Sequence, residues 1–262
     1  MRLAFVAVLL LPFTCADDAH ETAHRKHETA HRKHHRLIRK GIQTDPKICK
    51  EPMRNFLKLQ QDAYGDQSSE ALLTGANGTF HELLPLLASQ PATPKRILDV
   101  GCGMALYDLL VIDHYGYDPL LHLYLLDKTA DKTDALKAMD KWNAKTNDFG
   151  FYTSLECVED TLLRNGVQSQ QLHILNAGNG NSVLAPLDDG SFDLIYSLVS
   201  WGFHYPVTTY VAEAYRLLRP VTGRLQVDIR DPRGKLELQK AGFICDFGAQ
   251  RKAPRATCRK PA

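Results

Sequence analysis

The residues best placed to do chemistry form a short run that joins an apolar segment to a helical one. Asp99 lies near the end of the apolar segment at 96–100, and Gly101, Cys102 and Gly103 follow that segment directly, in the run DVGCGMA. Glycine adopts positive backbone dihedrals at no steric cost and lets the chain approach a ligand closely. A strand that turns through glycines into a helix is therefore a candidate site for a nucleotide-like ligand.

The spacing of the glycines limits which ligand this turn can hold. A dinucleotide fingerprint, G-x-G-x-x-G, would need a third glycine where Leu106 stands. The phosphate-binding pattern G-x-x-x-x-G-K-[ST] does not occur in the chain. The run instead reads D-x-G-x-G-x-A from Asp99 to Ala105. This pattern disfavours a nicotinamide dinucleotide and a phosphate loop.

Two later apolar runs also end in polar side chains. Asp127 ends the run at 120–127, and Asn176 lies near the end of the run at 171–177. A carboxylate offers two acceptor oxygens and suits a pair of vicinal hydroxyls, while an amide oxygen can accept from an amino group. The alternative for both residues is a structural cap or turn.

A fourth segment, FDLIYSLVSWGFHYP at 192–206, gathers side chains that could meet a substrate. Ser197, Trp201, His204 and Tyr205 lie within it. Ligands of open α/β sheets bind at the carboxyl ends of the strands, where this segment is expected to lie. The unperturbed pKa of histidine lies near neutrality, so His204 is the candidate general base. Core packing is the alternative for Trp201, and a structural role is the alternative for His204.

The elements that must position these residues alternate between strand and helix. Strands are expected at 96–100, 120–127, 171–177, 192–200 and 223–230, with helical patterns between them, and two short runs at 243–250 and 255–260 form a terminal hairpin. This order predicts an α/β three-layer sandwich whose mostly parallel seven-stranded sheet ends in an antiparallel hairpin.

The run from Asp99 to Ala105 resembles motif I of the class I S-adenosylmethionine-dependent methyltransferases, and the resemblance extends over about 96–260. It implies a Rossmann-like methyltransferase fold and S-adenosyl-L-methionine as the cofactor. Ala105 departs from the family pattern, in which glycine is commoner. The resemblance implies cofactor-binding roles for Asp99, Gly101, Cys102, Gly103, Asp127, Asn176 and Ser197, substrate-binding roles for Trp201, Tyr205 and His81, and a catalytic role for His204.

The predicted function is direct methyl transfer to an unidentified small-molecule acceptor. Two alternatives stay open: a non-catalytic binding module with the same fold, and a nicotinamide-dependent oxidoreductase. The residues show no metal-binding cluster, so no metal is expected. A net charge of +2 does not indicate a nucleic-acid partner.

The amino-terminal part has a different character. Arg2 and an apolar run at 3–13 predict a signal peptide over 1–16, because the run is too short to span a bilayer comfortably; a membrane anchor is the alternative. A His-rich leader at 17–44 and a helical lead-in at 45–95 precede the methyltransferase domain at 96–262. The expected location is the secretory pathway or an organelle, and the cytoplasm if no signal peptide is present. The spacing of the six cysteines specifies no disulfide pairing.

Overall fold

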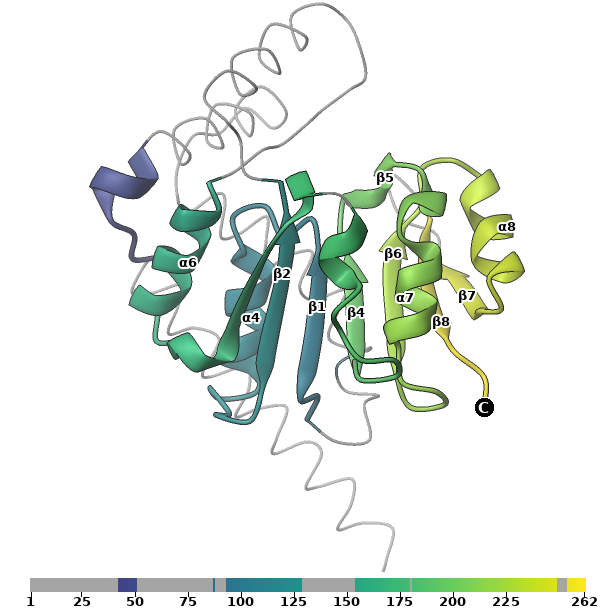
Figure 1. The fold of residues 1–262 in the computed structure, drawn as a ribbon, viewed down its shortest axis with the longest axis horizontal. Coiled ribbons are helices and arrows are strands. Elements are labelled where there is room, and N and C mark those ends of the chain that lie inside the picture. Colours follow the sequence, from purple (N-terminus) through teal and green to yellow (C-terminus); the bar gives the residue numbers. More distant parts are fainter. Residues whose placement is uncertain (1–41, 51–86, 88–92, 129–153, 180, 249–253) are drawn as a thin grey trace, which may run out of the picture.

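The computed structural model describes residues 42–50, 87, 93–128, 154–179, 181–248 and 254–262 (Figure 1). The predicted signal peptide, most of the His-rich leader, most of the helical lead-in with His81, and the helix expected at 130–146 lie outside the described residues.

A seven-stranded sheet forms the centre of the fold (Figure 1), in the order β3-β2-β1-β4-β6-β8-β7. The strands are β1 (Arg96–Val100), β2 (His122–Asp127), β3 (Leu172–Asn176), β4 (Leu194–Ser197), β6 (Arg224–Asp228), β7 (Ile244–Gly248) and β8 (Arg255–Arg259). Pairing is parallel from β3 through to β6, and β8 is antiparallel to both of its neighbours. The predicted fold class, a mostly parallel sheet with a terminal antiparallel hairpin, is confirmed.

Within the hairpin, which lies at the end of the sheet as predicted, β8 lies between β6 and β7, and β7 forms the edge. One detail of the sheet differs from the expectation. The strand expected over 192–200 stops at Ser197, and a second extended segment, β5 (Ser200–Tyr205), begins after a two-residue break. Val199 in this break has a φ of 56°, which ends the strand because a β-branched residue cannot continue a ladder in that conformation.

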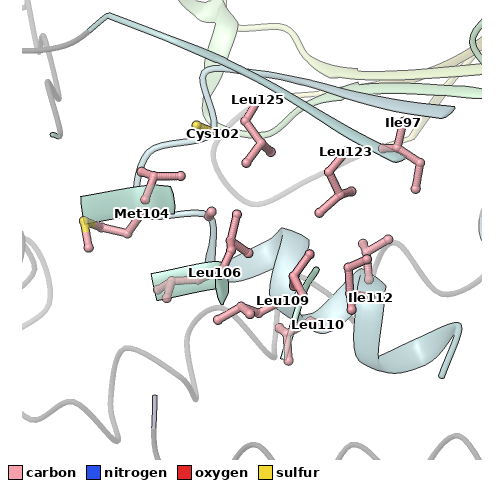
Figure 2. Close-up of a cluster of buried hydrophobic side chains, with 14 of the residues drawn as sticks. Ile97, Cys102, Met104, Leu106, Leu109, Leu110, Ile112, Leu123 and Leu125 are labelled. Carbon is pink, nitrogen blue, oxygen red and sulfur yellow. The ribbon is translucent and has the colours of Figure 1, made fainter. Parts of the chain in front are cut away.

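Helices cover both faces of the sheet. They are α4 (Leu106–His114), α6 (Leu155–Arg164), α7 (Val211–Leu217) and α8 (Arg233–Lys240), with short 3₁₀ turns at Ser169–Gln171, Ala177–Asn179, Asn181–Leu184 and Val207–Thr209. Because side chains alternate along a strand, β1 sends Ile97 into one buried cluster and Leu98 into another. The first cluster packs β1 and β2 against α4 (Figure 2) and α6, and the second packs the sheet against α7 and α8.

Two disulfides are present, one between distant parts of the chain and one within the terminal hairpin. Cys49 is bonded to Cys157 at the start of α6, across a sequence separation of 108. Cys245 and Cys258 face each other in register across β7 and β8 and form the second bond. The cysteine spacing did not reveal either pair. Among the described helices, none has the length and apolar character that crossing a membrane requires.

Candidate cofactor site

The glycine turn is fixed at the carboxyl end of β1 by strand β2. The backbone N–H groups of Gly101 and Cys102 both donate to the carbonyl oxygen of Leu126, at 2.6 and 3.3 Å. Gly101, Gly103 and Ala105 all have positive φ angles, of 87°, 56° and 54°. Ala105 therefore adopts a left-handed conformation that costs a residue with a Cβ atom about 1–2 kcal/mol. The alanine at this position strains the turn.

The two glycines serve different purposes. A Cβ atom on Gly101 would lie 1.8 Å from Ser200 Oγ, so this glycine is needed because β5 packs directly against the turn. A Cβ atom on Gly103 would meet no atom of the described residues within 4 Å. Gly103 is therefore the glycine whose open side permits a ligand to approach the backbone.

Asp127 links the end of β2 to this turn. Its Oδ2 accepts a 2.7 Å hydrogen bond from the Gly103 N–H, and its Oδ1 accepts a 2.7 Å bond from the Lys128 N–H. Burial raises the pKa of Asp127 to about 6, and the two backbone bonds oppose this rise. Each oxygen keeps a second lone pair. The carboxylate can therefore accept further hydrogen bonds from a ligand beside Gly103.

Asn176 lies next to Asp127 across the sheet. The two residues are paired in register at the carboxyl ends of β3 and β2. Asn176 is partly exposed, and its Oδ1 accepts a 2.9 Å bond from the Gly178 N–H. The structure thus brings together two residues that were predicted to bind the cofactor. Asn176 also makes the turn contact expected of its alternative role as a structural turn residue.

A pair of buried acids lies beneath the turn. Asp99 and Asp108 are 2% and 0% exposed, and their carboxyl groups are hydrogen-bonded to each other. Tyr196 on β4 donates its hydroxyl to Asp108 Oδ1 at 2.6 Å. Burial, followed by the charge of Asp108, raises the pKa of Asp99 well above its usual range. Burial raises the pKa of Asp108 to about 6, against the hydrogen bond from Tyr196.

Asp108 was missed by the sequence analysis. The signal was a single acid inside the apolar helical run LYDLLVI, at a position that the helix turns toward the sheet. A charged residue is almost never fully buried without a partner, so such an acid indicates a second polar group opposite it.

Two other predicted cofactor residues are buried in the framework of the site. Ser197 is fully buried; its hydroxyl donates to the Val100 carbonyl oxygen at 2.6 Å and accepts from the Trp201 N–H at 2.8 Å. Cys102 is 5% exposed and is a free cysteine. Ser197 therefore joins the ends of β1 and β5, and Cys102 packs beneath the turn.

The break between β4 and β5 is held by a buried ion pair. The Val199 N–H donates to Asp228 Oδ2 at 3.0 Å. Arg255 on β8 donates to both oxygens of Asp228, at 2.6 and 3.1 Å, and both side chains are 6% exposed. A β-branched residue with positive φ is strained. The Asp228–Arg255 pair supplies the fixed acceptor that keeps Val199 in this conformation beside the glycine turn.

The predicted acceptor-side residues separate into different environments. Trp201 is fully buried, and its indole N–H donates to the Val207 carbonyl oxygen at 2.9 Å. This placement agrees with the core-packing alternative. Tyr205 is 40% exposed at the end of β5, and His204 beside it is partly buried. Burial, and then the charge of Arg230, lowers the pKa of His204 to about 4.

The hydrogen-bond acceptors and acids of this site suit a nucleoside with a cationic group better than they suit a metal ion. Within the described ranges, no group of three or more histidine, cysteine, aspartate or glutamate side chains is arranged to hold a metal. The open side of Gly103, the adjacent acceptors of Asp127 and Asn176, and the acids beneath the turn suit ribose hydroxyls, an amino group and positive charge.

No family model and no curated protein sequence matches this chain. The solved structures similar to it include the precorrin-6y C5,15-methyltransferase of Geobacter metallireducens, with 12% identity, 69% of this chain and 87% of that chain covered, and a TM-score of 0.45. A SAM-dependent methyltransferase of Aquifex aeolicus has 14% identity, coverage of 68% and 88%, and a TM-score of 0.42. An O-methyltransferase family protein of Burkholderia thailandensis has 10% identity, coverage of 78% and 63%, and a TM-score of 0.44.

The fold follows from the sheet itself, whose strand order and pairing the structure gives directly. The described chain has a Rossmann-like α/β fold with a mostly parallel seven-stranded sheet that ends in an antiparallel hairpin.

Proposed function

We propose that this chain is an S-adenosylmethionine-dependent methyltransferase that acts on a small-molecule acceptor. The observation that carries the proposal is the contact between Asp127 and Gly103. A strand-end carboxylate holds the backbone of an open-sided glycine, with Asn176 paired beside it. This arrangement offers hydrogen-bond acceptors to a ribose and an amino group next to a backbone that a ligand can approach closely.

The residues of the site would divide the work of binding. Asp127 would accept from the ribose hydroxyls, Asn176 would accept from the adenine amino group, and Gly103 would admit the methionine portion beside the backbone. The bound cofactor supplies a methyl group already activated by the positive charge on its sulfur. The protein therefore contributes mainly alignment of the acceptor with that methyl group.

His204 would act on the acceptor side. A histidine with a pKa of about 4 is neutral at pH 7, so its imidazole can accept a proton from a protonated acceptor. The same low pKa makes it a weak base, which suits an acceptor that loses its proton only as the bond to the methyl group forms. Tyr205, exposed at the end of β5, would contact the acceptor from the same segment.

Calorimetric titration tests the cofactor assignment directly. The chain is expected to bind S-adenosylmethionine and S-adenosylhomocysteine and not to bind NAD. Incubation with methyl-labelled S-adenosylmethionine and a panel of small phenols, thiols, amines and carboxylic acids then tests turnover. Binding of NAD alone would overturn the proposal. Cofactor binding without label transfer to any acceptor would favour the non-catalytic binding module.

The two disulfides support a second part of the proposal, that the chain works in an oxidising compartment reached through a signal peptide at 1–16. Structural disulfides form and persist in secretory compartments and are rare in the cytosol. Mass spectrometry of the protein purified from its source under thiol-blocking conditions checks this. We expect Cys49–Cys157 and Cys245–Cys258 peptides and an amino terminus near residue 17; free thiols at all four cysteines and an intact Met1 would contradict it.

A further inference from the structure

The acid pair Asp99–Asp108 lies directly beneath the proposed cofactor turn, and cofactor contacts alone do not require it. Asp99 ends β1 two residues before Gly101, and Asp108 comes from the first turn of α4. The two side chains are hydrogen-bonded to each other and almost completely buried. Tyr196 donates to Asp108 from the adjacent strand β4. Three elements thus converge on one buried pair of carboxyl groups.

Such a pair must hold a proton at neutral pH. Two carboxylates in hydrogen-bond contact repel each other strongly in a buried site, so one of them keeps its proton and donates it to the other. The ionisable groups that act on Asp99 are Asp108 on α4 and Asp127 on β2; Cys102 in the turn is affected by all three acids. Tyr196 contributes a donor and no charge of its own. None of these groups within the described part of the chain is basic, so no fixed positive charge replaces the shared proton.

A cationic ligand in the turn would supply the missing positive charge. S-adenosylmethionine carries a sulfonium charge that S-adenosylhomocysteine lacks, while the ribose, the adenine and the amino-acid groups of the two ligands are the same. Any response of the acid pair to this one charge is therefore electrostatic and distinct from the hydrogen bonds that Asp127 and Asn176 would make to both ligands.

We propose that Asp99 and Asp108 form a proton-linked charge sensor beneath the cofactor turn, which releases its proton to solvent when a sulfonium ligand, but not its neutral thioether product, occupies the turn. The inference rests on the proposed function. No covalent bond changes in this step: the proton leaves the carboxyl pair for the buffer, and the added negative charge remains facing the sulfonium. Asp108 is thus a positioning residue that favours the methyl donor over the spent cofactor.

The linkage predicts a pH dependence of selectivity. Because proton release accompanies binding of the sulfonium, raising the pH favours S-adenosylmethionine over S-adenosylhomocysteine. Between pH 5 and pH 7, below the usual pKa of an α-amino group, the ratio of the two dissociation constants should change by about threefold to tenfold. Asp127 also titrates near pH 6. Its hydrogen bonds to the ribose would act equally on both ligands, but its charge also acts on Asp99, so an Asp127 variant is needed to separate its contribution from that of the acid pair.

Isothermal titration calorimetry of the full chain with both ligands tests the proposal, in buffers of different ionisation enthalpy that report the protons released. For the wild type, S-adenosylmethionine should release more protons at pH 6 than S-adenosylhomocysteine. Asp108→Asn keeps the size of the side chain, an acceptor for Tyr196 and a donor to Asp99. It should abolish the difference in proton release and make the affinity ratio independent of pH. Asp127→Asn is the matched control: it should weaken both ligands and, because the Asp127 charge raises the pKa of Asp99, shift the pH dependence of their ratio to lower pH without removing it.

Tyr196→Phe provides a second variant that keeps both carboxyl groups. Loss of the Tyr196 hydroxyl removes a hydrogen bond that lowers the pKa of Asp108, so the pH dependence of the ratio should move to higher pH. A wild-type ratio that does not vary with pH, or a pH dependence that survives Asp108→Asn, would overturn the charge sensor while leaving the methyltransferase proposal intact. Failure of both ligands to bind the wild type would instead overturn the proposed function and the inference with it.

Discussion

Gly101 and Ser200 lie so close together that a single added methyl group cannot fit between them. A Cβ atom on Gly101 would lie 1.8 Å from Ser200 Oγ and 2.4 Å from Ser200 Cβ. The start of β5 therefore packs directly against the glycine turn, and the two segments proposed to hold cofactor and acceptor share one contact. This contact distinguishes the structural glycine from the ligand-facing one, and the first prediction follows from it.

Gly101→Ala should destabilise the fold, whereas Gly103→Ala should weaken cofactor binding. Both substitutions place alanine at a positive φ, at about 1–2 kcal/mol, but only the first also overpacks the site, at a further 1–3 kcal/mol or so. Urea denaturation with calorimetry of S-adenosylmethionine binding separates the two effects. Ser200→Gly in the Gly101→Ala background should restore part of the lost stability. Equal losses of stability in the two single variants would contradict the assignment of Gly101 as the structural glycine and Gly103 as the ligand-facing one.

Asp127→Ala should reduce the affinity for S-adenosylmethionine by at least tenfold or so, because charge-assisted hydrogen bonds contribute about 1.5–3 kcal/mol each. Part of the loss comes from the Gly103 N–H, which would lose its acceptor. Asp127→Asn keeps one acceptor oxygen and should lose less. Calorimetric titration measures both affinities. A twofold effect or less for the alanine variant would mean that Asp127 only caps the backbone.

Protein stability should fall as the pH rises through 6 because of Asp108. The pKa of Asp108 is about 6 in the folded protein and about 3.9 in an unfolded chain, so the native state binds the extra proton between these values. Its stabilising effect is complete below pH 4 and is lost above pH 6. Urea unfolding of Asp108→Asn should show a smaller decline from pH 4 to pH 7 than the wild type. Parallel stability curves for the two proteins would show that Asp108 does not titrate in this range.

His204 should titrate near pH 4, and its neighbour Arg230 should contribute to that value. Burial is the larger cause of the lowered pKa and the Arg230 charge is the smaller one. Arg230→Gln should therefore raise the pKa of His204 modestly, as followed by NMR of the imidazole protons. If His204 is the general base, His204→Ala should slow methyl transfer by about 10²-fold while leaving cofactor affinity nearly unchanged. Normal turnover in that variant would assign His204 a structural role.

Breaking the Cys245–Cys258 bond should cost about 3 kcal/mol of stability, because the bond closes a short loop in the unfolded chain. Breaking Cys49–Cys157, which spans 108 positions, should cost more, about 4–5 kcal/mol by the same chain-entropy relation. Urea denaturation of the Cys245→Ala/Cys258→Ala and Cys49→Ala/Cys157→Ala double variants measures both values, with Cys102→Ser as a control that removes no disulfide. If reducing the wild-type protein left its urea denaturation midpoint unchanged, the two disulfide assignments would be contradicted.

The sequence predicted the fold well because local patterns specify its main elements. The apolar run at 96–100, ended by glycine, predicted the bounds of β1, which is Arg96–Val100 in the structure. Asp127 and Asn176 were identified separately as strand-end residues, and their register pairing confirms that they share one edge of the sheet. Such features depend on residues that are close in the sequence, so periodicity and turn chemistry reveal them.

The features that the sequence did not predict depend on partners far along the chain. The break after Ser197 requires the Asp228–Arg255 pair to hold Val199, and those residues come from β6 and β8. The role of Asp108 depends on Asp99 and Tyr196, which folding brings to it from two strands. The cysteine pairs likewise follow from the register of β7 with β8 and from the position of α6, neither of which the cysteine spacing contains.

The position of β8 between β6 and β7 has a consequence for how the protein is made. During translation β7 emerges from the ribosome before β8, yet it cannot join the sheet until β8 has bridged the gap to β6. Arg255, which completes the ion pair under the β4–β5 break, arrives with the same strand. The nascent chain can therefore assemble the β3-β2-β1-β4-β6 part of its sheet early, while the break beside the glycine turn is secured only when β8 emerges, after all the other described strands.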